Sequence, residues 1–151
     1  MPATLQLGRW WLIGLDTRIA ERPEGALPEA QLTWLAELAA RHAAPRGGIF
    51  MHHPPLTIGS PWMDPMGLRG ATALWQLCGR WPTQRFIACG HVHQNFDTWH
   101  GRVQVLATPS TCVQFAPRAR RYQTDLRAPG YRILDLHDDG RVTTEVVRVV
   151  L

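Results

Sequence analysis

The sequence predicts a domain of the α/β class that is built around a mixed β-sheet. Three apolar runs that indicate buried strands, at residues 9–16, 48–52 and 85–89, alternate with two helical segments at residues 28–44 and 72–81. A strand, a helix and a second strand in this order imply parallel strands joined by a right-handed crossover. Beyond the second such unit the pattern changes to paired strands with tight turns, which adds antiparallel strands.

The first strand is nearly all apolar, as expected for a strand buried on both faces, and it ends at Asp16. After a loop, Pro28 suits the first position of a helix, which we expect to continue to about Ala44. Pro45 then ends this helix. The residues that recur at helical spacing and would face the sheet are Leu32, Leu35, Leu38, Ala39 and His42.

The second unit begins with residues 53–67, whose prolines and glycines predict a structured loop rather than a linker between domains. The helix over residues 72–81 would turn Ala73, Leu74, Leu77 and Cys78 toward the sheet, and Pro82 ends it. The next strand completes a second parallel pair. We find no internal repeat and treat residues 1–151 as a single, partial domain.

The C-terminal third predicts strands in hairpins. Residues 95–107 predict an antiparallel hairpin, and residues 113–115 predict a further short strand. Residues 116–129 are polar and arginine-rich and predict a mobile loop. Residues 131–149 predict a last hairpin, because Asp139-Gly140 favours a tight turn.

Composition narrows the class of protein. The chain is 45% hydrophobic and 19% charged, which fits a soluble globular protein and excludes a disordered one. The net charge is +4, and every basic residue is an arginine. The arginines that approach a cluster, Arg118, Arg120, Arg121 and Arg127, all lie in the predicted loop. We expect a solvated loop there, with a phosphate-attracting rim as the alternative, and no nucleic-acid binding.

The three cysteines and the apolar N-terminal run bear on location. Three cysteines at these spacings match neither a disulfide framework nor a zinc ribbon, so we expect reduced thiols in a cytoplasmic protein. The apolar run at residues 10–15 is too short to span a membrane and lacks the features of a signal peptide. We therefore expect no membrane partner.

Four of the seven histidines fall in two short motifs, each directly after a predicted strand. The motifs are His52-His53-Pro54-Pro55 and Gly90-His91-Val92-His93. Sites in α/β sheets gather at the carboxyl ends of strands, and neutral imidazole is the commonest metal ligand. The two motifs together predict a metal site; the alternative is hydrogen-bonded surface histidines.

Within these motifs we assign different roles. His52 continues its strand and is the expected ligand, whereas His53 is the candidate catalytic residue, which either supports the ligands or contacts substrate. His91 and His93 are also expected metal ligands, because residues two apart can reach one ion or two. The remaining histidines, His42, His100 and His137, we interpret as structural or solvated.

The chain resembles the second half of the calcineurin-like metallophosphoesterases, and closer still the bacterial class III cyclic-AMP phosphodiesterases. The resemblance begins with the two histidine motifs and covers nearly the whole chain. Other stretches that carry it are residues 62–64, 106–115, 128–132 and 139–146.

The resemblance implies a four-layer α/β/β/α sandwich, of which this chain would be the C-terminal half. It implies two metals, iron or manganese and possibly zinc, with His52 and His91 on one and His93 on the other. A metal-activated hydroxide would hydrolyse a phosphodiester; the resemblance implies 3′,5′-cyclic AMP to 5′-AMP, with a different phosphodiester or phosphomonoester as the alternative. Substrate choice should lie in the loops over residues 53–67 and 109–129, where Trp62 either stacks a purine or packs on its own loop.

The family's N-terminal metal-binding motifs, Asp-x-His followed by Gly-Asp and Gly-Asn-His, are missing here: Gly-Asp and Gly-Asn-His do not occur, and the Asp-x-His at Asp135-Leu136-His137 lies in the predicted last hairpin and not at the end of a first strand. Asp64 and Asp97 do not stand where the family places a ligand. We therefore expect at most one weakly held metal in this chain, negligible activity, and apolar surface that favours a homo-oligomer. The alternative function is a non-catalytic half-domain that self-associates or binds a partner.

Overall fold

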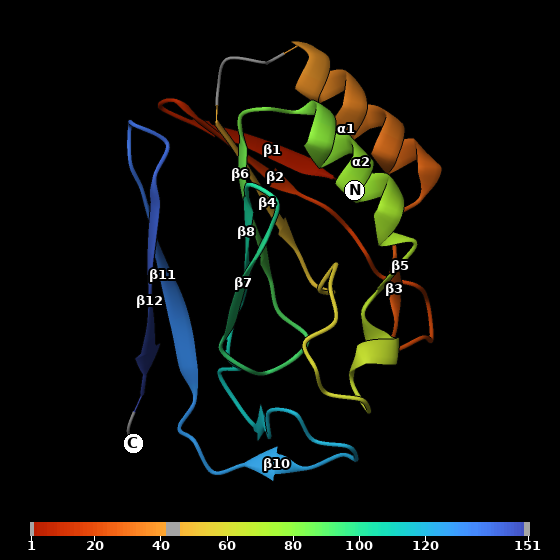
Figure 1. Cartoon of the computed structure of the whole chain (residues 1–151), viewed down its shortest axis with the longest axis vertical. Helices are drawn as coiled ribbons and strands as arrows, with labels where there is room; N and C mark the ends of the chain where they lie inside the picture. Colours follow the sequence, from red (N-terminus) through yellow and green to blue (C-terminus); the bar gives the residue numbers. More distant parts are fainter. Residues whose placement is uncertain (1, 42–45, 150–151) are drawn as a thin grey trace.

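The computed structural model describes residues 2–41 and 46–149 and centres on a six-stranded sheet in the order β1-β2-β4-β6-β8-β7 (Figure 1). Neighbours within β2, β4, β6 and β8 are parallel, whereas β1 and β7 pair antiparallel at the two edges. The α/β class with a mixed sheet is therefore confirmed. The strands are β1 (Ala3–Leu7), β2 (Trp10–Gly14), β4 (Arg46–Met51), β6 (Gln84–Cys89), β7 (Phe96–His100) and β8 (Val103–Ala107).

Two helices, α1 (Glu29–Arg41) and α2 (Ala71–Arg80), lie side by side over one face of this sheet (Figure 1). Leu35 and Leu38 of α1 are buried, as their helical spacing predicts. Leu74 and Cys78 of α2 are buried in the same core, which includes Ile13, Ile49 and Ile87 of the central strands. The predicted end of the first helix, with His42, Ala44 and Pro45, lies outside the described residues.

A two-stranded ribbon, β11 (Gly130–Leu136) and β12 (Val142–Arg148), lies against the opposite face of the sheet (Figure 1). It covers a second buried cluster that includes Trp10 and Phe86, with Leu134 and Leu136 packed on top. The predicted last hairpin is thereby confirmed. Helices, sheet and ribbon form three layers, which fit one half of the expected sandwich.

Part of the ribbon-side face remains uncovered. Phe50 contacts Phe86 there and is still 37% exposed. Leu5 and Leu7 of β1 are 60% and 57% exposed, and they pair with Leu12 and Trp10, which belong to the ribbon-side cluster. Paired residues on neighbouring strands point to the same face, so these side chains extend one apolar surface. We call Leu5, Leu7 and Phe50 the open face.

The structure adds short elements that the sequence did not predict. Strand β1 forms a hairpin with β2, and the predicted loop over residues 116–129 contains β10 (Thr124–Asp125), which pairs with β9 (Gln114–Phe115). The predicted loop before the first helix contains β3 (Gly25–Ala26), which pairs in parallel with β5 (Leu68–Arg69), a strand that directly follows the predicted loop over residues 53–67; a 3₁₀ turn covers Asp64–Met66 within that loop. Strands of two residues are too short to show a hydrophobic period, so no local sequence pattern predicts them.

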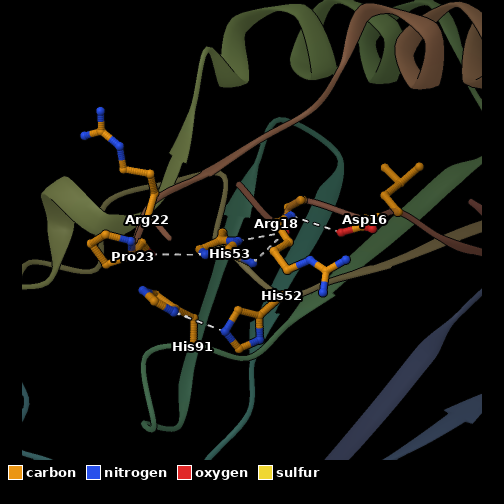
Figure 2. A pocket seen from close by; sticks show the side chains of 9 residues that line it. Asp16, Arg18, Arg22, Pro23, His52, His53 and His91 are labelled. Carbon is orange, nitrogen blue, oxygen red and sulfur yellow. Dashed lines mark hydrogen bonds between the residues drawn. The ribbon is translucent and has the colours of Figure 1, made fainter. Parts of the chain in front are cut away.

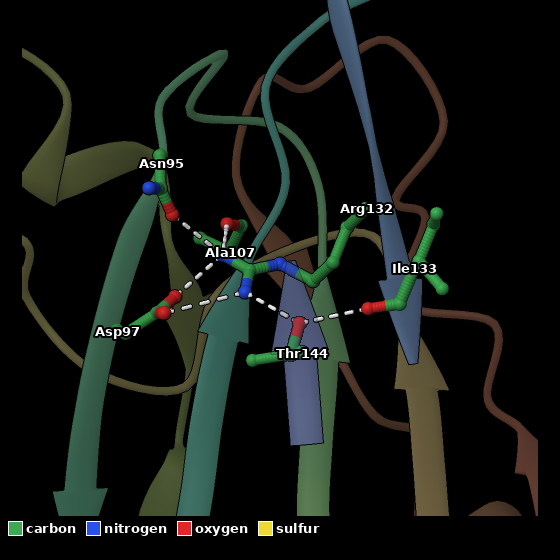
Figure 3. A network of polar contacts seen from close by, with 6 residues as sticks. All are labelled: Asn95, Asp97, Ala107, Arg132, Ile133 and Thr144. Atoms are coloured by element: carbon green, nitrogen blue, oxygen red, sulfur yellow. Dashed lines mark hydrogen bonds and ion pairs between the residues drawn. The ribbon is translucent and has the colours of Figure 1, made fainter. Parts of the chain in front are cut away.

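A buried arginine fastens the ribbon to the sheet. The Arg132 side chain from β11 is only 3% exposed and forms an ion pair with Asp97 of β7 (Figure 3). It also donates hydrogen bonds to the Asn95 side chain at 2.6 Å and to the Ala107 carbonyl at 2.8 Å. A further bond to the Thr144 hydroxyl, at 2.9 Å, ties in β12. These contacts hold the chain directly after the second histidine motif.

Cys78 and Cys89 are buried, Cys112 is exposed, and all three are free thiols. In the described part of the chain, neither α-helix is long and apolar enough to cross a membrane.

Candidate metal centre

The parallel sheet brings the two histidine motifs together. β4 and β6 are neighbours, with Met51 opposite Cys89, so both strands end at the same edge of the sheet. His52 follows the first strand directly, and His91 follows the second after Gly90. Figure 2 shows the two rings facing each other, with His91 Nδ1 and His52 Nε2 3.1 Å apart. The predicted convergence of these histidines is what this sheet order produces.

The separation of these two nitrogens fits a shared metal ion. Two nitrogens bound about 2.0–2.1 Å from one ion lie roughly 2.8–3.4 Å apart, depending on whether the coordination is octahedral or tetrahedral. His91 Nε2 is buried near the Met66 backbone and forms no regular hydrogen bond with the described residues. A proton on Nε2 would leave the lone pair on Nδ1, the atom that faces His52.

His53 is the third member of the group, because one nitrogen of each of the three rings lies within 4.8 Å of the others. Its own nitrogens are engaged from the other side. Nε2 donates to the Pro23 carbonyl at 3.2 Å, so in the neutral ring Nδ1 accepts the Thr17 hydroxyl at 2.8 Å. A Cβ atom on Gly25 would lie 2.3 Å from this Nδ1, so only glycine allows the ring to sit here. Of its two predicted roles, this geometry favours support.

His93 lies outside this group of three. Its Nδ1 donates to the Val113 carbonyl at 2.9 Å, which leaves the lone pair on Nε2. Its ring stacks on Phe115 with 4.4 Å between centroids and 2° between planes. The backbone φ angles of His91 and His93 are 65° and 49°, a left-handed conformation that turns the chain sharply after β6. His93 is thus oriented by its own contacts, apart from the His52–His91 pair.

Among the described residues, the close group of ligand-type side chains contains histidines and no carboxylate. Asp64 accepts the backbone N–H of Ile58 at 2.8 Å, and Asp97 pairs with Arg132. Both carboxylates therefore stabilise their own segments, in line with the expectation that neither is a ligand. His100 stacks on Trp75, and His137 hydrogen-bonds Thr143, so both have structural contacts as predicted.

A cavity of about 680 Å³ opens beside the three histidines (Figure 2). Its opposite wall comes from the segment after β2, which lies outside the two histidine motifs. Thr17 is buried against His53, whereas Arg18 is exposed at the rim. The predicted parallel pairing could have placed this segment at the site, because parallel β2 and β4 end at the same edge of the sheet. The lining residues are Leu15, Asp16, Thr17, Arg18, Arg22, Pro23, His52, His53 and His91.

Partial removal from water favours the neutral form of these histidines. It lowers the pKa of His91 from 6.5 to about 4, with the neighbouring imidazoles acting in the same direction. Burial also lowers the pKa of His52, helped by His93, and the pKa of His53, helped by His52. Neutral rings keep the lone pairs that a metal ion requires.

The lowered pKa of His91 predicts how stability changes with pH in a chelator-treated sample. Between pH 6.5 and about 4 the unfolded chain binds a proton on His91 that the folded chain does not. The free energy of unfolding should therefore fall as the pH drops through this window. Urea unfolding at pH 7.5, 5.5 and 4.5 measures it, and the curve of His91→Gln should be flatter. Parallel curves for the two proteins would refute this assignment.

Curated proteins with similar sequences cover nearly the whole of this chain. The chain is 41% identical to a 3′,5′-cyclic adenosine monophosphate phosphodiesterase CpdA from Vibrio vulnificus, over 98% of this chain and 54% of that protein. It is 43% identical to a protein of the same name from Pseudomonas aeruginosa, over 96% of this chain and 53% of that protein. The chain thus spans about half the length of the curated relatives it matches. No family model matches it.

Among solved structures, a dimetal phosphatase from Danio rerio superposes with a TM-score of 0.61 at 14% identity, over 88% of this chain and 56% of that one. At this identity the match concerns the fold alone. The sequence matches and the shared fold together confirm the resemblance to calcineurin-like metallophosphoesterases and to cyclic-AMP phosphodiesterases.

Proposed function

We propose that this chain is one half of a metal-dependent phosphodiesterase that hydrolyses 3′,5′-cyclic AMP to 5′-AMP in the cytoplasm. The observation that carries the proposal is the His52–His91 pair, whose facing nitrogens are 3.1 Å apart at adjacent strand ends. It is supported by relatives named as cyclic-AMP phosphodiesterases, which the chain matches over nearly its whole length. In this proposal residues 1–151 form a single, partial domain.

The proposed ligands are His52 and His91 for one metal and His93 for a second, with iron or manganese favoured over zinc. When bound, such metals lower the pKa of a coordinated water so that hydroxide is available near neutral pH. The Val113 carbonyl holds the His93 ring with Nε2 free. The Thr17 hydroxyl and Pro23 carbonyl hold His53 behind the pair, where we assign it a positioning role.

The phosphate of the substrate would enter the cavity between these histidines and the segment after β2. Arg18 and Arg22 line this cavity and are the cations there. A guanidinium group suits phosphate because it donates two parallel hydrogen bonds. The cyclic nucleotide is then bound as a small molecule, and the proposal needs no nucleic-acid partner.

Activity should require carboxylates that the described residues do not bring to the histidines. Two adjacent cations repel, and imidazoles carry no charge to offset them, so this chain should hold at most one metal weakly. We expect negligible turnover of cyclic AMP by the purified chain. The longest natural polypeptide that contains these residues should hydrolyse it.

Elemental analysis and a panel of cyclic nucleotides, applied to both proteins, test the proposal. Two tightly held metals with turnover in the 151-residue chain would overturn the assignment of a half-site. No turnover of any cyclic nucleotide by the longer protein would reject the proposed activity and favour the non-catalytic half-domain.

We also propose that the chain self-associates through the open face. Leu5, Leu7 and Phe50 expose apolar surface on one side of the sheet, and β1 leaves a free strand edge beside it. Light scattering should show a dimer or larger species at high concentration. Replacing Leu5 and Leu7 together by lysine should shift it toward monomer, whereas Tyr131→Lys, exposed on the ribbon, should not. A wild-type monomer at all concentrations would contradict this.

A further inference from the structure

Three aromatic rings gather beside the candidate metal centre, contributed by loops far apart in sequence. Trp62 lies in the loop after β4, whereas Phe115 and Tyr122 belong to the segment around β9 and β10. The Trp62 ring meets Phe115 at 5.1 Å and 80°, and Tyr122 at 5.4 Å and 83°. Phe115 and Tyr122 are 5.6 Å apart at 67°. We call these three residues the aromatic cluster.

The cluster is one ring away from a proposed metal ligand. Phe115 stacks flat on His93, with centroids 4.4 Å apart, and Tyr122 contacts the same Phe115. The two loops are also joined by a hydrogen bond from the Arg118 backbone N–H to the buried Ser60 hydroxyl, at 2.9 Å. The position of Tyr122 relative to the histidines is therefore set by several contacts.

The three rings are not equivalent. Phe115 is covered on one side by His93, and Trp62 is half-buried between Phe115 and Tyr122, so Trp62 is packed rather than open. Tyr122 is 64% exposed although it is an aromatic residue in an ordered contact. An exposed aromatic ring that is held in place by edge contacts with two other rings can stack with a flat ligand.

The segment that carries Tyr122 is positively charged. Arg118, Arg120 and Arg121 are all exposed. Within the described residues none of the three takes part in an ion pair, in contrast to Arg127, which pairs with Asp125. A free cation next to an exposed aromatic ring suits a ligand that combines a flat base with an anionic group.

We propose that the exposed ring of Tyr122 is the surface on which the base of a nucleotide stacks while its phosphate lies at the histidines. This inference rests on the proposed function and adds a residue that determines specificity. Trp62 and Phe115 act as positioning residues that hold the ring. The path from His93 to Tyr122 consists of two ring contacts, 4.4 Å from His93 to Phe115 and 5.6 Å from Phe115 to Tyr122, a span that a nucleotide with its phosphate on the His93 side and its base on Tyr122 can bridge.

The test compares 5′-AMP, which is not turned over, with ribose 5-phosphate, which lacks the base. NMR of the labelled 151-residue chain with zinc follows the ring signals of His91 and Tyr122. We expect 5′-AMP to shift both rings and ribose 5-phosphate to shift His91 alone. If both probes shift His91 and neither shifts Tyr122, the proposed stacking on Tyr122 is wrong and the proposed function stands.

The other outcomes are also decisive. If neither probe shifts His91, the phosphate site of the proposed function fails, and the inference fails with it. If 5′-AMP shifts Tyr122 without His91, the base binds apart from the centre, which also overturns the inference.

Variants separate stacking from structure. Tyr122→Ala should weaken 5′-AMP binding about fivefold or more and leave ribose 5-phosphate unchanged, because one base–aromatic stack is lost. Tyr122→Phe keeps the ring and should stay within about twofold of wild type. Tyr131→Ala, which changes the chain's other tyrosine, 45% exposed on β11, is the matched control and should have no effect. Equal weakening by Tyr122→Ala and Tyr131→Ala would overturn the proposal.

Discussion

Replacing His91 by alanine is expected to abolish zinc binding by this chain, with a rise in Kd of more than about a hundredfold. Loss of an outer-shell partner alone typically costs 10–100-fold in metal affinity, so loss of a direct ligand should cost more. His91 Nδ1 is one of the two nitrogens that face each other at 3.1 Å, and its lowered pKa keeps that lone pair available at neutral pH. Competition against a chromogenic chelator at pH 7.5 measures the effect.

Two further histidine variants sharpen this test. His52→Ala should weaken binding of the same ion to a similar extent, because it removes the facing nitrogen. His93→Ala should leave that ion largely in place, since His93 lies outside the close group of three. His137→Ala is the matched control, because its ring contacts Thr143 in the distant hairpin. Unchanged zinc affinity in His91→Ala, with an unchanged circular dichroism spectrum, would remove the metal centre from consideration.

Replacing Arg132 by methionine is expected to lower the free energy of unfolding by about 2–4 kcal/mol, since hydrogen bonds to a charged group contribute about 1.5–3 kcal/mol each and are not additive. The Arg132 side chain is 3% exposed and joins Asp97, Asn95, Ala107 and Thr144 in one network. Methionine keeps most of the volume and restores none of these bonds. Asp97, 43% exposed, regains water when its partner is lost, which limits the cost.

Urea unfolding at pH 7.5 measures this loss. Arg141→Met is the matched control, because its guanidinium is 64% exposed and lies 3.7 Å from an Asp139 carboxylate that is equally open to water. Exposed pairs of this kind contribute about 0–1 kcal/mol, so its midpoint should hardly move. Equal effects of the two substitutions would show that the ribbon does not depend on Arg132.

The order of strands and helices was predictable because it depends on local sequence patterns, namely apolar runs and helix-ending prolines. Buried parallel strands appear as continuous apolar runs. The helix α2 ends just ahead of Pro82, the residue that was predicted to end the helix over residues 72–81. Boundaries differ by a few residues at most. Strand β1 was not predicted, although Leu5 and Leu7 alternate with Thr4 and Gln6 as in a strand; it has five residues, and the tight turn at Gly8 with φ 54° joins it to β2.

The sequence by itself determined that His52 and His91 meet, because each follows a buried strand and the ends of adjacent parallel strands lie at one edge. Only the tertiary structure decided how the other histidines are used. The contacts of His53 with Thr17, 36 residues away, and of Arg132 with Asp97, 35 residues away, depend on loop conformation and rotamer choice. The stack of His93 on Phe115, which lies apart from the close group of three histidines, depends on the same factors. Such contacts leave no periodic signal along the chain, since they arise only when the sheet and its loops have brought distant side chains together.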